Sequence, residues 1–375
     1  MGRGASAPRN APRVDGACLP VYVTAEATRM ALTSTAETTT FNHTEQVAEG
    51  WYWALRSASL KQGGVAPVKL LGRDLVAWRG QDGVVRVADA FCPHMGAHLA
   101  EGRVDGTGIR CFFHDWRFAA DGACDLVPCQ DKPANVRIRT WPVAEKYGLV
   151  WVYTGAEPRF PVPFAPELEH DPCDARLSSA FEKACHPNVV MINAIDAQHF
   201  NSVHNLPVKL TMERRDLSVH AASFSNTTGP NPDTWFGRLL ERFYAGPITY
   251  SLCYWAGTNG TVTLGPDFWH FHILFALRLG EGGKTEGQTV LLTKRRAGPG
   301  TLLSWVALFL SDLVGSYFAM GDTRVFQTIR FDFQTPVKSD HAIVGFIKHF
   351  EAQPAVRWGS WEPVAPGLSL AASAP

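Results

Sequence analysis

The sequence has no excess of charge of either sign, because Lys and Arg together number 35 and Asp and Glu also number 35. A protein that binds nucleic acid needs concentrated positive charge to meet the phosphates, so nucleic acid is not an expected partner. Charged residues make up only 19% of the chain, whereas 46% of its residues are hydrophobic. This composition predicts a large buried volume, and the length of 375 residues allows two domains.

The chain also lacks the apolar segment of a secretory signal and a compact framework of Cys pairs. Residues 1–45 are rich in Ala, Thr, Arg and Pro and are predicted to be a disordered leader. Six of the eight Cys lie outside the motif described below and show no disulfide spacing: Cys18, Cys124, Cys129, Cys173, Cys185 and Cys253. Free thiols in a reducing compartment predict a cytoplasmic protein.

One apolar run extends over 19 residues, from Leu302 to Met320, and reaches the length of a membrane span. Asp312 lies at its centre, where a charge costs about 2.5–3.5 kcal/mol on insertion. We therefore expect a buried helix here and no membrane span.

The most specific pattern that is present pairs two Cys with two His. Cys92-Pro-His94 is followed, after sixteen residues, by Cys111-Phe-Phe-His114. Two thiolates and two imidazoles at these offsets are the ligand set of a Rieske 2Fe-2S cluster, in which two His replace two Cys on one iron. The replacement raises the reduction potential, so the sequence predicts a protein that accepts single electrons and passes them on.

A zinc site is the alternative interpretation of two Cys and two His. Zinc fingers usually place both Cys close together and ahead of both His, whereas each Cys here is followed by its own His. His98 could compete with His94 as a ligand, but the second half of the motif has no matching residue. We expect His98 to be a loop residue.

Residues 46–160 are predicted to form a small antiparallel β domain. Short β-rich runs alternate with turns, and Gln81-Asp82-Gly83 between two such runs indicates a hairpin. Four Pro between Pro158 and Pro166 cannot continue a sheet and predict a boundary. Residues 161–375, where runs such as Phe268–Leu279 alternate with helical segments, are predicted to be a second domain of α+β class built on an antiparallel sheet.

A second site is predicted where Asp196, His199 and His204 follow one another closely. On an ideal helix two residues five positions apart point about 140 degrees away from each other, which is too far for one metal ion. The two imidazoles can meet only if the helix has a π-type bulge or ends between them. Pro207 favours an end nearby.

Two His and one carboxylate on one side of a metal leave positions free for O₂ and substrate, as in non-heme Fe(II) oxygenases. We choose Asp322, directly after the long apolar run, as the carboxylate; Asp312, Asp216 and Asp332 remain open as alternatives. The plainer interpretation is that His199 and His204 are ordinary structural residues.

Together the two motifs resemble the Rieske non-heme iron oxygenases, of the ring-hydroxylating alpha-subunit type, from about residue 50 onward. The resemblance implies one 2Fe-2S cluster on Cys92, His94, Cys111 and His114 and one Fe(II) on His199, His204 and Asp322. It implies a helix-grip (START-like) catalytic sheet flanked by helices. It also implies a homotrimer in which Asp196 connects His199 to a neighbouring subunit's cluster, at the imidazole of His114.

The blocks around Asn193 and Val203-His204-Asn-Leu-Pro are most similar to the arylamine N-oxygenases of this family. We therefore expect O₂-dependent N-oxygenation of an aryl or heteroaryl amine, with Asp196 and Asn193 as catalytic residues and Trp269, Phe271 and Phe275 as pocket walls. Carbon hydroxylation, demethylation or desaturation by the same site is one alternative. An electron carrier without chemistry of its own is another. No dinucleotide-binding motif follows a strand, so a separate flavin or ferredoxin reductase is an expected partner.

Overall fold

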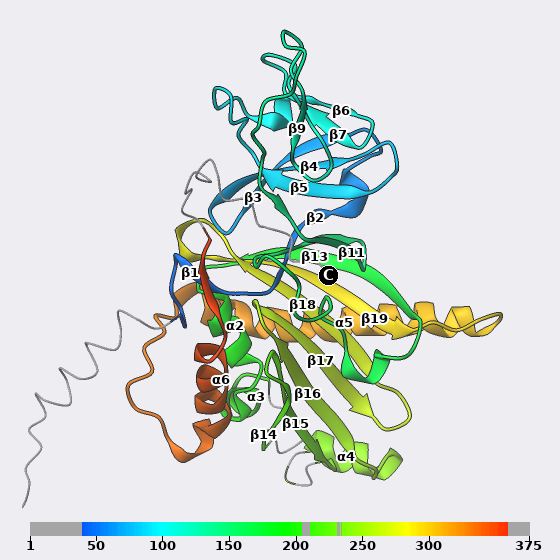
Figure 1. Cartoon of the computed structure of the whole chain (residues 1–375). Helices are drawn as coiled ribbons and strands as arrows, with labels where there is room; N and C mark the ends of the chain where they lie inside the picture. The colour runs from blue at the N-terminus through cyan, green and yellow to red at the C-terminus, as the bar shows by residue number, and fades with distance from the viewer. Residues whose placement is uncertain (1–39, 205–210, 231–232, 234, 359–375) are drawn as a thin grey trace, which may run out of the picture. The chain divides into compact units, whose positions relative to one another are not determined.

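The computed structural model describes residues 40–204, 211–230, 233 and 235–358 (Figure 1). The predicted leader, residues 1–45, lies outside the described residues except for residues 40–45. Strands pair antiparallel in every sheet, and helices lie against the largest sheet. The predicted α+β class is therefore confirmed.

The first part of the chain forms three small sheets. One has the order β10-β5-β4-β3, one the order β11-β12-β2, and one the order β6-β7-β8-β9. The strands are β2 (Trp51–Arg56), β3 (Val65–Leu70), β4 (Arg73–Arg79), β5 (Val85–Asp89), β6 (Arg103–Asp105), β7 (Gly108–Arg110), β8 (Arg117–Phe118), β9 (Cys124–Leu126), β10 (Thr140–Trp141), β11 (Val143–Lys146) and β12 (Leu149–Tyr153).

The hairpin predicted at Gln81-Asp82-Gly83 joins β4 to β5. Gly83 has a φ of +79°, a conformation that glycine adopts without steric cost, and its N–H donates to the Gly80 carbonyl at 3.0 Å. The Pro-rich stretch between Pro158 and Pro166 contains no strand, as its missing N–H donors require.

The second part is a seven-stranded sheet of order β13-β19-β18-β17-β16-β15-β14. Its strands are β13 (Cys173–Lys183), β14 (Glu213–Ser218), β15 (Ala221–Thr228), β16 (Ile248–Trp255), β17 (Asn259–Pro266), β18 (Phe271–Leu279) and β19 (Thr285–Lys294). The helices are α2 (Pro187–Asn193), α3 (Ala197–Ser202), α4 (Trp235–Phe243), α5 (Gly300–Thr328) and α6 (His341–Glu351).

Alternation along β18 explains how this sheet is covered on both faces. Ile273 packs with Leu308 of α5, and Leu277 packs in the cluster that also contains α2 and α6. Leu274 and Ala276 point the other way, into a cluster with Trp51 and other residues of β2 and β12. Helices therefore lie on one face of the sheet and the first part of the chain on the other.

The prediction that the apolar run from Leu302 to Met320 would be a buried helix is only partly correct. The run does lie in α5, and none of the described helices is both long and apolar enough to cross a membrane. However, Trp305 is 61% exposed and Phe309 62% exposed, whereas the smaller Ser304 and Ser311 are buried. Small side chains allow α5 to approach the sheet closely, and a run apolar on all sides does not reveal which side turns inward.

The last described segment returns to the first part of the chain. β20 (Ala355–Arg357) pairs with β1 (Gln46–Ala48), and the indole of Trp358 donates to the Leu70 carbonyl at 2.7 Å. Trp358 is buried in the same cluster as Trp141. Residues on both sides of the predicted boundary at 160/161 thus contribute to one core.

Candidate metal centres

Cys92 and Cys111 begin two loops with the same hydrogen-bond pattern. The N–H of Cys92 donates to the carbonyl five residues later, at Ala97, and the N–H of Gly96 donates back to the Cys92 carbonyl, both at 2.9 Å. Cys111 repeats this with Trp116 at 2.9 Å and Asp115 at 3.1 Å. Gly96 and Asp115, the equivalent fourth residues, have φ values of +74° and +59°. The two loops are therefore closed in the same way.

Asp115 is not a glycine, so its left-handed conformation needs support. The carboxylate receives a hydrogen bond from Arg110 Nη1 at 2.8 Å and a second from Arg103. These two bonds fix the shape of the second loop, immediately after His114.

The four side chains divide into a buried pair and an exposed pair. Cys92 and Cys111 are each only 2% exposed, and burial, together with the adjacent Cys111, raises the pKa of the Cys92 thiol to about 12. His94 and His114 are exposed, with ring centroids 4.6 Å apart, and His94 stacks on Trp116. A neutral buried thiol needs a metal beside it to lose its proton, as happens when a thiolate coordinates iron.

The quartet is arranged as one pair of thiols and one pair of imidazoles. Cys92 lies beside Cys111, and the ring of His94 lies 4.6 Å from that of His114. A Rieske cluster divides its ligands in the same way, with the two His on one of its two irons.

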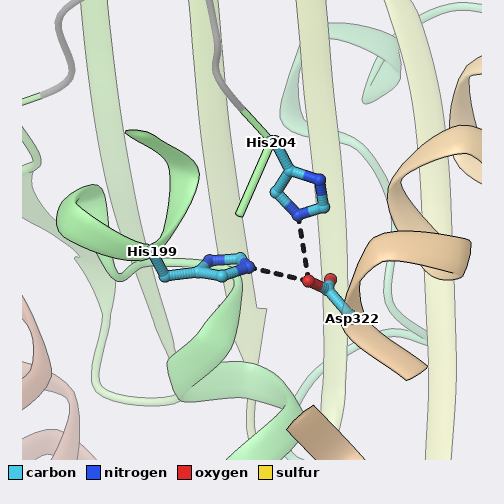
Figure 2. A group of neighbouring side chains, drawn as sticks. All are labelled: His199, His204 and Asp322. Atoms are coloured by element: carbon cyan, nitrogen blue, oxygen red, sulfur yellow. Dashed lines mark hydrogen bonds and ion pairs between the residues drawn. The ribbon is translucent and has the colours of Figure 1, made fainter. Parts of the chain in front are cut away.

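The second site is formed by residues from three segments (Figure 2). His199 lies in α3, which ends at Ser202, so the predicted end of the helix between the two His is confirmed. His204 therefore lies outside the helix and can turn back, and the two ring centroids are 4.8 Å apart. Asp322 comes from α5, and its Oδ1 lies 2.7 Å from His199 Nε2 and 2.9 Å from His204 Nε2.

The electrostatics of this triad suit a divalent cation. Burial lowers the pKa of His204, although the charge of Asp322 acts in the opposite direction. Burial alone would raise the pKa of Asp322, but the hydrogen bond from His199 and the neighbouring imidazoles outweigh it, and the pKa lies below its usual value. A neutral imidazole and an ionised carboxylate are the protonation states that bind metal.

The structure separates Asp322 from the other carboxylates considered. Asp312 is paired with Arg176, Asp216 is paired with Arg214, and Asp332 is exposed beyond the end of α5. Asp322 is the one of the four that reaches both imidazoles.

The two predicted catalytic residues lie beside the triad in different ways. Asn193 Nδ2 is 3.3 Å from His199 Nε2, and Asn193 also helps to lower the pKa of Asp322. Asp196 is the N-cap of α3, where its carboxylate accepts the N–H of Gln198 at 2.9 Å and that of His199 at 3.2 Å. His199 Nδ1 is buried without a hydrogen-bond partner among the described residues, so no contact joins its ring to Asp196.

Gly321 is a site residue that sequence reasoning missed. A Cβ at this position would lie 2.8 Å from His204 Cε1 and 3.0 Å from Nδ1. Glycine within a helix costs about 1 kcal/mol relative to Ala. The close approach of His204 explains why a glycine is nevertheless present at this position. The signal in the sequence was a glycine directly before a predicted ligand.

The triad opens on a cavity of about 330 Å³ between α5 and the sheet. Its walls are mostly apolar and include Phe200, Tyr250, Ile273, Phe275, Leu291 and Phe326, with His199, Asp322 and Asn193 at the metal end. Of the predicted aromatic walls, Phe275 lines this cavity, and Trp269 and Phe271 do not. A larger open groove of about 810 Å³ beside Tyr147 and Arg295 contains none of the predicted site residues.

A β domain with a paired Cys-His motif, followed by a helix-covered antiparallel sheet with two His and one Asp, is the arrangement that the Rieske non-heme iron oxygenases have, and the chain carries a Rieske domain within a fold of that kind. Residues 50–143 match the model of the Rieske [2Fe-2S] domain. Members of the family use a mononuclear iron in addition to the cluster, and the donor atoms of the triad fit that ion.

Two curated relatives each match less than half of the chain. It is 40% identical over 176 residues to cholesterol 7-desaturase of Bombyx mori, covering 46% of this chain and 38% of the relative. It is 37% identical over 178 residues to aminopyrrolnitrin oxygenase PrnD of Pseudomonas fluorescens, covering 45% of this chain and 49% of the relative. The chain thus spans half or less of the length of these relatives.

Solved structures extend the likeness of fold over most of the chain. Pseudomonas putida CBB5 NdmA, a mutant form with caffeine, superposes with a TM-score of 0.58 at 16% identity, covering 80% of this chain and 88% of that one. Dicamba monooxygenase bound to dicamba gives 0.54 at 16% identity, covering 81% and 97%. The fold of both parts is therefore that of these proteins.

Proposed function

We propose that this chain is the oxygenase component of a system that uses O₂ and electrons from a separate reductase to oxidise an apolar small molecule. The supporting observation is the convergence of His199, His204 and Asp322 on one point at the end of an apolar cavity. Bound there, Fe(II) would supply O₂ activation, and the cluster held by Cys92, His94, Cys111 and His114 would supply single electrons.

The chain's own residues orient the substrate and limit the access of water. Phe200, Tyr250 and Phe275 present apolar surface to the substrate next to the triad. The hydroxyl of Tyr250 is occupied by the Ala194 carbonyl at 2.6 Å, and burial raises the pKa of Tyr250 far above its ordinary value. Tyr250 therefore acts as a neutral wall. Asn193 has an amide within hydrogen-bonding distance of His199 and lowers the pKa of Asp322, and we propose that it orients these two side chains.

Electron delivery is proposed to occur between subunits of a homotrimer. His94 and His114 are surrounded by exposed apolar side chains, Phe91, Met95, Phe112 and Phe113, which form a surface suited to contact with another protein. Asp196 is partly exposed, next to the backbone of His199, and is the proposed contact for a neighbouring subunit's His114.

N-oxygenation of an aryl or heteroaryl amine is the first candidate reaction, supported by the similarity to the aminopyrrolnitrin oxygenase. Oxidation at carbon is the second, supported by comparable similarity to a cholesterol 7-desaturase and a 3-ketosteroid-9-alpha-monooxygenase. Incubating holoenzyme, a ferredoxin reductase system and O₂ with panels of arylamines and sterols distinguishes them by mass spectrometry of the products. N-oxidised products from the amine panel are expected, and products only from sterols would replace the first candidate by the second.

An electron carrier without its own chemistry would give no product with either panel. The matched control is His199→Ala, which removes one ligand of the triad and leaves the cluster loops untouched. Product formation that depends on His199 supports the oxygenase, and substrate-independent electron transfer that is unchanged in His199→Ala, with no product from wild type, would overturn it.

A further inference from the structure

The cavity has a second polar end, far from the triad, around Asp312. Asp312 is the only charged residue between Arg296 and Asp322 in the sequence. Its Oδ2 receives a hydrogen bond from Arg176 Nη2 at 2.7 Å, and its Oδ1 receives one from the hydroxyl of Ser178. Asp312 and Ser178 both line the cavity.

Strand β13, which carries Arg176 and Ser178, contains a β-bulge next to Asp312. The register of β13 on β19 shifts between Leu177 and Ala180, so Ser178 and Ser179 form a bulge. The carbonyls of both serines accept hydrogen bonds from Gln288 Nε2, at 3.1 and 3.4 Å, and Gln288 is fully buried. Bulges that redirect side chains are frequent beside active sites, and this one places Ser178 and Ser179 in the cavity wall.

The geometry of α5 sets the separation of the two polar ends. Asp312 and Asp322 are ten residues apart in one helix, which is about 15 Å along the axis. At about 100 degrees per residue, Asp312, Ser316 and Thr323 lie within about 40 degrees of one another, and all three line the cavity. Between the ends the opposite wall is apolar, with Ile273, Phe275 and Leu291. The cavity is therefore elongated.

A purely structural ion pair does not account for this arrangement. The side chains of Arg176 and Asp312 are 34% and 35% exposed, and ion pairs that solvent reaches contribute only about 0–1 kcal/mol to stability. Such a pair needs neither a bulge in β13 nor a carboxylate facing an apolar cavity. An ionised carboxylate accepts about four hydrogen bonds, and each oxygen of Asp312 has one protein partner among the described residues. Lone pairs remain for a ligand that donates.

We infer that Asp312, positioned by Ser178 and Arg176, binds a hydroxyl or amino group at the distal end of the substrate while the substrate's apolar body extends along the cavity toward the triad. The ligand class is a rigid, largely apolar molecule of at least two rings with a hydrogen-bond donor at the end remote from the oxidised atom. This inference rests on the proposed function for the identity of the site as a substrate pocket. It makes Asp312 a specificity-determining residue.

The test compares two probes, 4-hydroxybiphenyl and biphenyl, which differ only in a terminal donor. Affinities are measured by equilibrium dialysis with the iron-loaded holoenzyme, without O₂ and without reductant. Wild type is expected to bind 4-hydroxybiphenyl about tenfold more tightly, as a hydrogen bond to a charged acceptor allows. In Asp312→Asn the amide oxygen stays with Arg176 and the charged acceptor is lost, so the preference should fall to that of a neutral hydrogen bond or less.

Asp332→Asn is the matched control, because Asp332 is exposed and does not line the cavity; it should keep the full preference. Asp312→Leu adds an apolar residue to an apolar helix and remains informative if Asp312→Asn folds poorly; it should favour biphenyl. A preference that persists in both Asp312 variants, or no binding of either probe by wild type, would overturn the inference. Binding is measured without turnover, so the two proposals can fail separately. If wild type prefers 4-hydroxybiphenyl, the Asp312 variants lose that preference and no panel gives a product, only the proposed function is refuted.

Discussion

The two candidate metal centres differ in how the chain assembles them. The quartet lies on two loops of the first part, each closed by its own pair of backbone hydrogen bonds, with thiols inside and imidazoles exposed. The triad joins His199 of α3, His204 just beyond that helix and Asp322 of α5. Both His are buried and Asp322 is partly buried, and His199 and Asp322 are separated by 123 positions in the sequence. One centre is local and faces outward, and the other is long-range and faces inward.

This difference matches the separate tasks that we propose for the centres. Exposed imidazoles with an apolar rim can exchange an electron with a partner, whereas a buried triad beside a cavity keeps water from the reacting atoms. The difference also predicts separate sensitivities. Local loops depend on their own turns, whereas the triad depends on α5 staying against β13, β18 and β19.

The largest expected effect is the separation of the metals by mutation. Cys111→Ser removes a buried thiolate, so the visible absorption of the cluster should disappear and the iron content should fall to the mononuclear ion. His199→Ala should leave that absorption unchanged and remove only the mononuclear ion. Both variants should lose at least about a thousandfold in turnover, because each lacks one of the two metals. Iron analysis and absorption spectra of the same samples provide the measurement.

Retention of the cluster in Cys111→Ser would contradict the assignment of the quartet. Loss of both metals in His199→Ala, with the unfolding transition unchanged, would show that the two centres are not assembled independently.

A smaller effect is expected where the two centres are proposed to meet. Asp196→Asn should retain both metals and the fold, because Asn is as good an N-cap as Asp and keeps the bonds to Gln198 and His199. Turnover should fall about a hundredfold if the carboxylate joins His199 to a neighbouring subunit's cluster. The measurement is single-turnover product formation, with rapid reduction of the cluster by the reductase as the internal reference.

Asp196→Ala is the comparison variant, since it also loses the N-cap and about 1 kcal/mol of stability. Equal turnover in wild type and Asp196→Asn would remove Asp196 from the electron path and leave it as a capping residue.

Much of this arrangement was predictable from the sequence, and the remainder depends on contacts between distant segments. The spacing of Cys92, His94, Cys111 and His114 indicated the cluster because ligands on short loops leave a local pattern. The end of α3 followed from helical geometry, since two His five residues apart cannot meet on a regular helix.

Other features could not be derived from local patterns. The bulge at Ser178 is bonded by Gln288 on the neighbouring strand, and the outward face of α5 could not be identified because that run is apolar on every side. The return of Trp358 to the Leu70 carbonyl joins positions separated by 288 residues, which no periodicity predicts.

The smallest expected effect tests the close approach inside the triad, at Gly321. Gly321→Ala should leave the helix as stable as before or more so, because Ala is favoured over Gly by about 1 kcal/mol. The new methyl group would nevertheless lie 2.8 Å from His204 Cε1 and displace the imidazole from Asp322. We expect the affinity of the mononuclear site for Fe(II) to fall about 10- to 100-fold, the range seen when groups that orient ligands are disturbed. Competition with a chelator measures the affinity, and thermal unfolding of the metal-free protein measures the fold.

Gly345→Ala in α6 is the matched control for this last change. The nearest atom to a Cβ there is Arg214 Cδ at 3.3 Å, on a long flexible side chain that can move aside. It should therefore leave the Fe(II) affinity unchanged, with stability the same or higher. If Gly321→Ala binds Fe(II) as tightly as Gly345→Ala, His204 has room to move without losing the metal. The buried centre would then tolerate local change as readily as the exposed one, and the two centres would not differ in this sensitivity.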